Sequence, residues 1–265
     1  MKSYRENGDY IVSEEDREFY HKNGYVTLYN VLTEEEVAGI EEVYDLFKDA
    51  ELPCVKEMGK DFCDMSQDFS TALEDFALIN AMLPTRYYPP LKNNVFERLA
   101  GSISRQLLGD DMVFDYDQFL TKKPGKGTAA FAMHQDMGYW PVTEDTRTAT
   151  CCLAITPSHR KNGCIGFIPG TGLEKRLLDH KAKDGDSHTL VMDLPAGSEP
   201  VFVEVPRGSV TVHDEWIVHG SGGNVSEEFR KTYVCAHRSK ATVEYERSIG
   251  FDHSHNSEDF RNVTV

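Results

Sequence analysis

The sequence predicts a mainly β fold with helical support, on the strength of two observations. Residues 1–109 are dominated by helical patterns, whereas residues 110–240 hold short β-rich runs separated by Gly, Pro and Asn. Helices first and strands afterwards are typical of an antiparallel β-barrel or sandwich braced by helices. A chain of 265 residues can form a single domain of this kind, with residues 241–265 as a C-terminal tail.

The helical part begins with two capping signals. Ser13 with Asp16, and Thr33 with Glu36, have the spacing of capping boxes, in which side chains satisfy the free N–H groups of a first helical turn. After Thr33, apolar residues recur at helical spacing on one face and glutamates occupy the other. Two helices are therefore predicted here.

Further elements follow from the same periodicities. Residues 24–29 indicate a short strand between the first two helices, and residues 69–82 and 93–108 repeat the helical pattern. Residues 171–199 carry many charges and few large apolar groups, so we interpret them as a loop insertion and a candidate cover for a site. The β-rich runs span residues 112–121, 128–137, 148–156, 164–168, 201–205, 209–212 and 230–238.

Charge and composition exclude several classes of partner. The formal net charge of -16 argues against nucleic acid and against an anionic membrane surface. No apolar run approaches the roughly 20 residues that span a bilayer, and the polar start is not a signal peptide. The six cysteines show no Cys-x-x-Cys spacing, which favours free thiols in a reducing compartment. A cytoplasmic protein that binds a small molecule is expected.

His134-Gln135-Asp136 is the candidate metal-binding motif. Ten histidines and 44 acidic residues give about 1.7 chance pairs of a histidine with an acid two places on. The chain has two, His134/Asp136 and His213/Glu215. The first lies in a β-rich run, where side chains two apart share a face. The second lies near a bend, which is more typical of a hydrogen-bonded structural histidine.

A third metal ligand and an anion-binding residue are predicted nearer the C-terminus. His219 follows an apolar run and precedes a glycine-rich turn, so it lies at a strand end. Two imidazoles and a carboxylate on one face of iron form the site of non-haem Fe(II) oxygenases. Arg230, on the next strand, shares a face with Thr232 and Val234. If that face is inward, the arginine needs an anion such as a dicarboxylate; an outward, solvated arginine is the alternative.

Three segments together resemble the phytanoyl-CoA dioxygenase family, which also contains ectoine hydroxylases. They are His134-Gln135-Asp136, the run Asn162–Gly170, and His219-Gly220-Ser221 with Arg230. The resemblance spans residues 14–240 and implies a double-stranded β-helix, a jelly-roll barrel of the cupin type. It also implies an Fe(II)/2-oxoglutarate-dependent dioxygenase, which consumes O2 and releases succinate and CO2. Such enzymes oxidise an unactivated C–H bond of a small molecule by hydroxylation, desaturation or ring rearrangement.

The resemblance also implies roles for single residues. His134, Asp136 and His219 would bind iron, and retention of Asp136 argues against a halogenase. Arg230 and Ser221 would hold the distal carboxylate of 2-oxoglutarate. These roles follow from matched positions in the family's motifs.

Other site residues are suggested by position. Gln118 and Trp140 resemble side chains that contact 2-oxoglutarate or line its pocket, and Lys122 is a secondary candidate. Substrate contacts are suggested by nearness in sequence to the metal motif and to His219. These candidates are Tyr139, Met137 and Trp216.

Strand parity predicts that the Phe131 side chain faces away from the metal ligands and is not part of the site. A cupin-like metal-binding or ligand-binding protein without redox chemistry is the alternative function, because one fold serves many functions.

Overall fold

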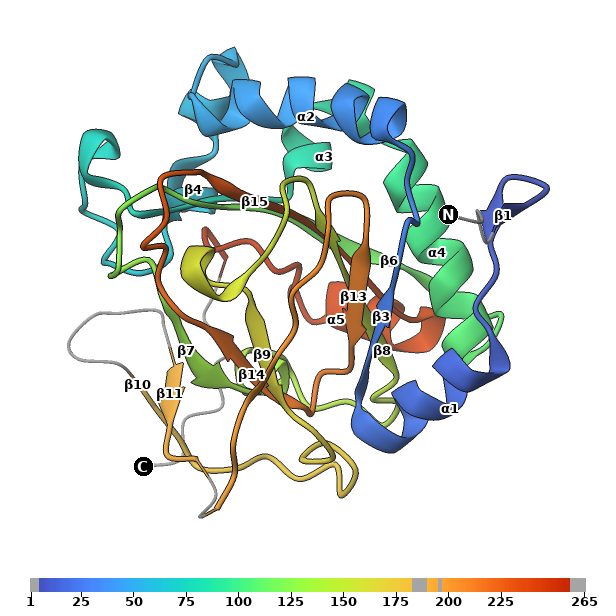
Figure 1. Cartoon of the computed structure of the whole chain (residues 1–265). Helices are drawn as coiled ribbons and strands as arrows, with labels where there is room; N and C mark the ends of the chain where they lie inside the picture. Colours follow the sequence, from blue (N-terminus) through green and yellow to red (C-terminus); the bar gives the residue numbers. More distant parts are fainter. Residues whose placement is uncertain (1–4, 183–189, 195–196, 258–265) are drawn as a thin grey trace.

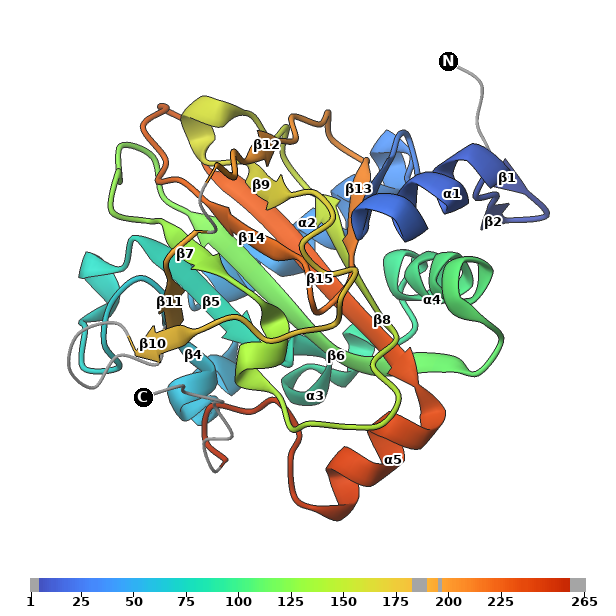
Figure 2. The same ribbon diagram turned by 90° about the horizontal axis from the view of Figure 1, so that it is seen from below.

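Two β-sheets face each other in the computed structural model, which describes residues 5–182, 190–194 and 197–257. The seven-stranded sheet has the order β3-β13-β8-β15-β6-β5-β4, and the four-stranded sheet has the order β12-β9-β14-β7 (Figures 1 and 2). Neighbouring strands in both sheets are antiparallel. The predicted mainly β, jelly-roll fold with helical support is confirmed.

The elements have the following bounds. The large sheet contains β3 (Tyr25–Leu28), β4 (Phe62–Asp64), β5 (Leu78–Met82), β6 (Met112–Lys122), β8 (Thr148–Ala154), β13 (Val210–His213) and β15 (Arg230–Ser239). The small sheet contains β7 (Phe131–His134), β9 (Ile165–Ile168), β12 (Val201–Phe202) and β14 (Val218–Ser221). Two hairpins pair β1 (Arg5–Glu6) with β2 (Asp9–Tyr10) and β10 (His180–Ala182) with β11 (Leu190–Met192).

The helices follow the same order. The α-helices are α1 (Glu14–Asn23), α2 (Glu34–Lys48), α3 (Pro84–Tyr87), α4 (Val95–Leu108) and α5 (Lys240–Ser248). Short 3-10 helices are η1 (Pro53–Glu57), η2 (Gly59–Asp61), η3 (Leu73–Asp75), η4 (Pro89–Leu91), η5 (Asp136–Tyr139) and η6 (Arg160–Asn162). In the part of the chain that the structure describes, no helix is both long and apolar enough to cross a bilayer.

Helices α2 and α4 cover the outer face of the large sheet. Apolar side chains of both helices join one core with Phe119 of β6 and Tyr233 of β15. The rings of Phe119 and Tyr233 lie 4.6 Å apart, edge to face. Each large apolar side chain buried here contributes about 1.5–3 kcal/mol. The inner face of the large sheet is thereby left to the cavity between the sheets.

The predicted caps are present. Ser13 Oγ accepts a hydrogen bond from the backbone N–H of Asp16 at 3.1 Å, and Thr33 forms a full capping box with Glu36. Helix α4 begins after Asn94, whose side chain accepts from two backbone N–H groups of the first turn. Local side-chain chemistry therefore fixes where these helices begin.

The predicted helix over residues 69–82 is wrong. The segment forms the short η3 and then strand β5, which pairs with β6 from Leu78 opposite Lys122 to Met82 opposite Gln118. All five residues of β5 are buried. A strand buried on both faces loses its alternating pattern, so that its apolar residues matched helical spacing by coincidence.

Three other segments differ from expectation. The predicted strand over residues 24–29 is present as β3, but the N-terminal part is less helical than predicted because β4 and β5 also join the large sheet. The predicted strand over residues 128–137 narrows to β7, after which the chain turns into η5. The insertion over residues 171–199 holds the β10–β11 hairpin beside β7, although residues 183–189 and 195–196 lie outside the described residues. The six cysteines are free, as predicted.

Candidate active site

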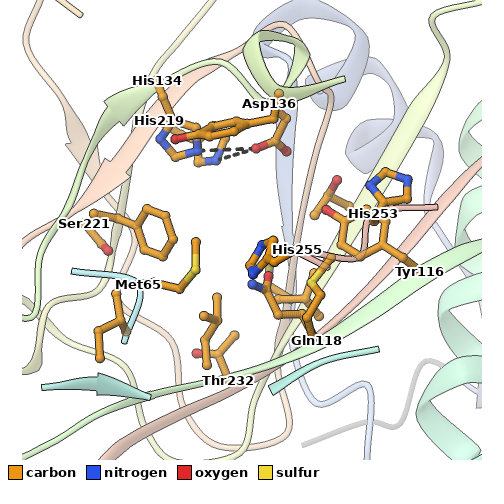
Figure 3. Close-up of a pocket in the computed structure, with 18 of the residues that line it drawn as sticks. Met65, Tyr116, Gln118, His134, Asp136, His219, Ser221, Thr232, His253 and His255 are labelled. Atoms are coloured by element: carbon orange, nitrogen blue, oxygen red, sulfur yellow. Dashed lines mark ion pairs between the residues drawn. The ribbon is translucent and has the colours of Figure 1, made fainter. Parts of the chain in front are cut away.

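A cavity of about 320 Å³ opens between the two sheets (Figure 3). Strands β6, β8, β13 and β15 supply one side of it, while β7, η5 and β14 supply the other. His134, Asp136 and His219 gather at one end in Figure 3. The jelly roll therefore brings together residues that are far apart in the sequence.

The three predicted metal ligands form one cluster. Nε2 of His134 lies 3.4 Å from Oδ1 of Asp136, and Nε2 of His219 lies 3.5 Å from the same oxygen. The ring centroids of the two histidines are 4.4 Å apart. All three side chains can offer one ligand atom to a common point.

The orientation of both imidazoles suits metal binding. Nδ1 of His134 lies 2.8 Å from the carbonyl oxygen of Ala132, and Nδ1 of His219 lies 3.0 Å from that of Ile217. A backbone carbonyl at Nδ1 fixes the tautomer with the proton there and leaves Nε2 with its lone pair. Burial lowers the pKa of His219 to about 3, so this ring is neutral, the form that binds metals.

Asp136 is held as a carboxylate. Burial raises its pKa, but His219, with His134 and His213, outweighs burial and holds the pKa well below its usual range. Nε2 of His213 lies 3.4 Å from Oδ2 of Asp136. Burial lowers the pKa of His213, but the contacts with Asp136 and Cys152 raise it to about 10. A cation thus already faces the free oxygen of this carboxylate.

The competing motif His213/Glu215 does not act as a pair. His213 faces the cavity beside Asp136, whereas Glu215 forms a fully buried ion pair with Arg238 at 3.0 Å. Glu215 also accepts a hydrogen bond from Thr148 at 2.7 Å. This glutamate is therefore committed to the structure, and only the histidine belongs to the site.

Strand parity gave the wrong side for Phe131. The pairing of β14 with β7 matches His219 with His134 but Ser221 with Phe131, so three steps on β7 face two on β14. A bulge of this kind shifts the facing of one strand by one residue. As a result Phe131 and His134 both line the cavity, with their rings 5.6 Å apart. Asp136 reaches the same cavity from η5 rather than from the strand.

Gln135, between two of the ligands, connects the metal motif to the insertion. Its backbone N–H donates to Nε2 of His180 at 3.0 Å, and its Oε1 accepts from the backbone N–H of Leu178 at 2.8 Å. Its Nε2 donates to the carbonyl oxygens of Arg176 and Trp216 at 3.1 and 2.6 Å. Gln135 is fully buried. The described part of the insertion is therefore bonded to the base of the metal cluster.

A second end of the cavity is cationic. Arg230 and Lys122 are direct cross-strand partners, and both line the cavity with Ser221. Nζ of Lys122 donates to Ser221 Oγ at 2.7 Å and to the carbonyl oxygen of Gly222. Burial, with Arg230 alongside, holds the pKa of Lys122 well below its usual range, and burial also lowers the pKa of Arg230.

Within the described residues this cationic end has no carboxylate partner. Nε of Arg230 is buried without a hydrogen-bond partner there, and neither Arg230 nor Lys122 forms an ion pair. Like charges placed directly opposite on neighbouring strands destabilise a sheet. The predicted inward arginine is found, and together with Lys122 it has the chemistry of an anion-binding site.

The other predicted co-substrate contacts also reach the cavity. Gln118 lines it and donates to Asn80 Oδ1 at 2.7 Å. Trp140 lines it as well, with the Arg238 guanidinium 4.8 Å from its ring centroid. Trp140 also packs edge to face on the ring of Tyr116.

Of the three residues predicted to contact the substrate, one lines the cavity and two do not. Tyr139 lines the cavity, and its hydroxyl accepts from the backbone N–H of Leu190 at 2.7 Å. Met137 and Trp216 do not line the cavity. Met137 is buried in η5, which turns its side chain away, and the backbone of Trp216 is bonded to Gln135. Nearness in sequence to the ligands was a poor guide to these two.

The segment after α5 supplies a wall that was expected to be a tail. We call it the C-terminal wall; its cavity-lining residues are Phe251, His253, Ser254, His255 and Ser257. The His253 ring stacks on Tyr116 at 4.1 Å between centroids. Met65 and Phe69, from the loop between β4 and β5, also line the cavity. The excess of histidine and aromatic residues after α5 was the available signal.

A second cluster of possible metal ligands already has its charge balanced. Asp115, Glu246 and His253 can offer atoms within 4.8 Å of one another. Arg247 lies 2.5 Å from Asp115, and Arg238 pairs with Glu246. These two guanidinium groups stand where a cation would, so we assign this cluster to the structure.

The sequence is similar to those of known proteins. The family model described as phytanoyl-CoA dioxygenase matches residues 20–232. A probable phytanoyl-CoA dioxygenase of Caenorhabditis elegans is 25% identical over 250 residues, which cover 89% of this chain and 78% of that protein. An ectoine dioxygenase of Bordetella bronchiseptica is 22% identical over 78% of this chain and 69% of its own length.

Solved structures share the fold. EvdO2 from Micromonospora carbonacea var. aurantiaca, complexed with 2-oxoglutarate, superposes with a TM-score of 0.69 at 24% identity, over 86% of this chain and 91% of that chain. The α-ketoglutarate-dependent carbocyclase SnoK from nogalamycin biosynthesis gives 0.68 at 21% identity, over 86% and 84%. The chain belongs to the phytanoyl-CoA dioxygenase family and is an Fe(II)/2-oxoglutarate-dependent dioxygenase.

Proposed function

We propose that His134, Asp136 and His219 hold Fe(II), and that Arg230, Lys122 and Ser221 hold the distal carboxylate of 2-oxoglutarate. The observation that carries this proposal is the pair of cavity cations without a described carboxylate partner. They lie in the same cavity as a cluster of two histidines and one carboxylate. A dicarboxylate that reaches from the metal to the cations would satisfy both.

The residues of the chain have distinct tasks in this proposal. The backbone carbonyls behind His134 and His219 keep both Nε2 atoms directed at the metal position. Ser221 would donate its hydroxyl to the co-substrate while Lys122 and Arg230 supply charge. When bound, iron and 2-oxoglutarate supply the oxidising power from O2, and succinate and CO2 are released. The buried surroundings exclude water from the reacting centre.

The substrate is proposed to be a small molecule that presents an unactivated C–H bond to the metal, such as a secondary metabolite or an amino-acid-like compound. The cavity volume of about 320 Å³ accommodates a compound of this size. Proteins of similar fold include the carbocyclase SnoK and the epimerase SnoN. The proposed reaction is a hydroxylation, a desaturation or a ring rearrangement of this small molecule.

We also propose a single-domain organisation, a reducing compartment and three further pocket contacts. Strands from residues 25–28 and 230–239 lie in one sheet, which supports a single oxygenase domain. Six free cysteines support a reducing compartment such as the cytoplasm. Gln118, Trp140 and Tyr139 are proposed as further pocket contacts because they line the cavity.

Anaerobic titration of 2-oxoglutarate into the Fe(II)-loaded protein tests the proposed site. We expect the weak visible charge-transfer band of an iron-bound 2-oxo acid, with one iron retained per chain. Asp136→Ala should lose both the iron and the band, because the carboxylate ligand is removed. Asp110→Ala, an exposed aspartate, is the control that should keep both. Iron retention by Asp136→Ala equal to that of the control would contradict the assignment.

A further inference from the structure

We propose that the substrate is an amphiphilic anion, with an apolar body against the C-terminal wall and an anionic group that meets Lys60. This inference rests on the proposed function and adds a substrate class to the same site. It follows from the charge inside the cavity, the way the wall is built and the position of Lys60.

The charge of the cavity is opposite to that of the chain. The chain carries a formal net charge of -16. Among the described cavity-lining residues, however, Asp136 is the only carboxylic acid, whereas the lysines and arginines are three in number: Lys60, Lys122 and Arg230. A site with one acidic and three basic side chains, on a strongly acidic protein, favours anions.

The co-substrate does not use up this positive charge. One carboxylate of 2-oxoglutarate is placed at the metal and the other at Lys122 and Arg230. Fe(II), Lys122 and Arg230 then carry four formal positive charges, whereas Asp136 and the two carboxylates carry three negative ones, so the loaded site keeps a positive charge. Lys60 is a further cation, outside the Lys122–Arg230 pair. An anionic substrate would therefore be favoured over a neutral or cationic one.

Lys60 is available for such a contact. It lies in η2, its side chain is exposed, and its Nζ stands 5.4 Å from the ring centroid of Phe69. Within the described residues Lys60 forms no ion pair with an acidic side chain. The Phe69 ring lies 5.9 Å from that of His255 in the C-terminal wall. Lys60 thus borders the cavity beside the wall.

The C-terminal wall is held rigidly in place. Asp61 is fully buried and accepts hydrogen bonds from Ser254 Oγ at 2.7 Å, the His255 N–H at 2.6 Å and Tyr87 Oη at 2.8 Å. Asn256 accepts from the Lys60 N–H at 3.0 Å. The wall and the backbone of Lys60 are therefore fixed relative to each other, which places the base of the Lys60 side chain beside the wall.

The hydroxyl groups of the wall are already committed. Ser254 Oγ donates to Asp61 and Ser257 Oγ donates to Asp252. Most of the remaining surface is apolar or aromatic, and the residues that provide it are Met65, Phe69, Leu78, Met82, Tyr116, Leu120 and Phe251. An apolar body fits this surface, and Lys60 is the formal charge beside it.

A pair of matched probes tests the proposal without turnover. Protein loaded with Mn(II) and N-oxalylglycine, which fill the metal and co-substrate places, is titrated calorimetrically with 2-naphthoate and with 2-naphthamide. We expect the carboxylate to bind about twofold to fivefold more tightly than the amide, the upper part of the range for an exposed ion pair. The preference should shrink as salt concentration rises.

Substitutions at Lys60 locate the effect. Lys60→Gln should abolish the preference and leave the affinity for the amide unchanged, and Lys60→Glu should reverse it. Lys56→Gln is the matched control, since Lys56 is exposed on the preceding η1 and does not line the cavity. It should retain the full preference.

Three results would overturn the proposal. They are equal affinities for the two probes, equal losses in Lys60→Gln and Lys56→Gln, and no binding of either aromatic compound. Failure of N-oxalylglycine to bind would instead count against the proposed function, so the two claims fail separately.

Discussion

Neighbouring cations on the two faces of β15 differ in how they are paired. Lys231 points to the outer face, where its Nζ lies 2.7 Å from Glu41 and 2.6 Å from Asp45 of α2. Arg230 points to the cavity, where it meets Lys122 and no described carboxylate. The outer cation is satisfied by the fold itself. The inner one is left for a ligand to satisfy, so pairing separates structural charge from binding charge.

The largest expected effect is on co-substrate affinity. Arg230→Met should weaken 2-oxoglutarate binding at least about 30-fold, because truncating one partner of a buried charge pair typically costs about 2–5 kcal/mol. Lys231→Met, one residue away, should change it by less than about threefold. Anaerobic titration followed by the charge-transfer band measures both. Similar losses in the two variants would remove the distinction between the faces.

Substitution of Lys122 should have an intermediate effect on 2-oxoglutarate affinity and should change how that affinity depends on pH. Burial lowers the pKa of Lys122 in the empty site, so a fraction of the protein carries an uncharged Lys122. That fraction takes up a proton when it binds 2-oxoglutarate. An anion raises that pKa again, and affinity should therefore fall as pH rises. Calorimetry in phosphate and Tris buffers measures the uptake. Lys122→Met should abolish it and weaken binding about tenfold.

The control for that experiment is the next residue. Lys123 hydrogen-bonds to a backbone carbonyl at the surface, so Lys123→Met should keep both proton uptake and affinity. Proton uptake that persists in Lys122→Met would assign the titration to another group.

The smallest expected effect is on stability and has opposite signs on the two faces. Arg230→Met removes a desolvated cation without a described carboxylate partner and should raise the free energy of unfolding by about 1 kcal/mol. Lys231→Met removes two ion pairs and should lower it by about 1 kcal/mol. Urea unfolding of the metal-free protein without 2-oxoglutarate measures both. If both substitutions changed the free energy of unfolding in the same direction, the charge of Arg230 would have to be balanced in the empty protein.

The features that sequence predicted are the locally determined ones. The caps at Ser13 and Thr33 depend on side chains three residues away, and the shared face of Arg230, Thr232 and Val234 depends on strand alternation alone. Both are set within a few residues of chain, which makes them readable. The metal residues were found because their spacing matched a family motif.

The missed features depend on distant partners. The Phe131 side chain lines the cavity because β7 has a bulge where it pairs with β14. The sequence of residues 128–137 does not indicate this bulge. Strand β5 is defined by pairing with β6, some 40 residues away along the chain. The C-terminal wall is held at the cavity by Asp61, which lies 193 positions before Ser254 in the sequence. Such contacts can be identified only in the folded structure.

Gln135 limits how this scaffold can be redesigned. Its side-chain amide joins the metal motif to the backbone at residues 176 and 178 and to Trp216, which precedes His219 by three positions. An insertion grafted from a relative would have to present a carbonyl and an N–H at the same two places. Without these groups Gln135 would lose two hydrogen bonds, and the positions of the metal ligands on either side of it would be less well fixed. The exchangeable module is therefore the insertion together with the strand it is bonded to.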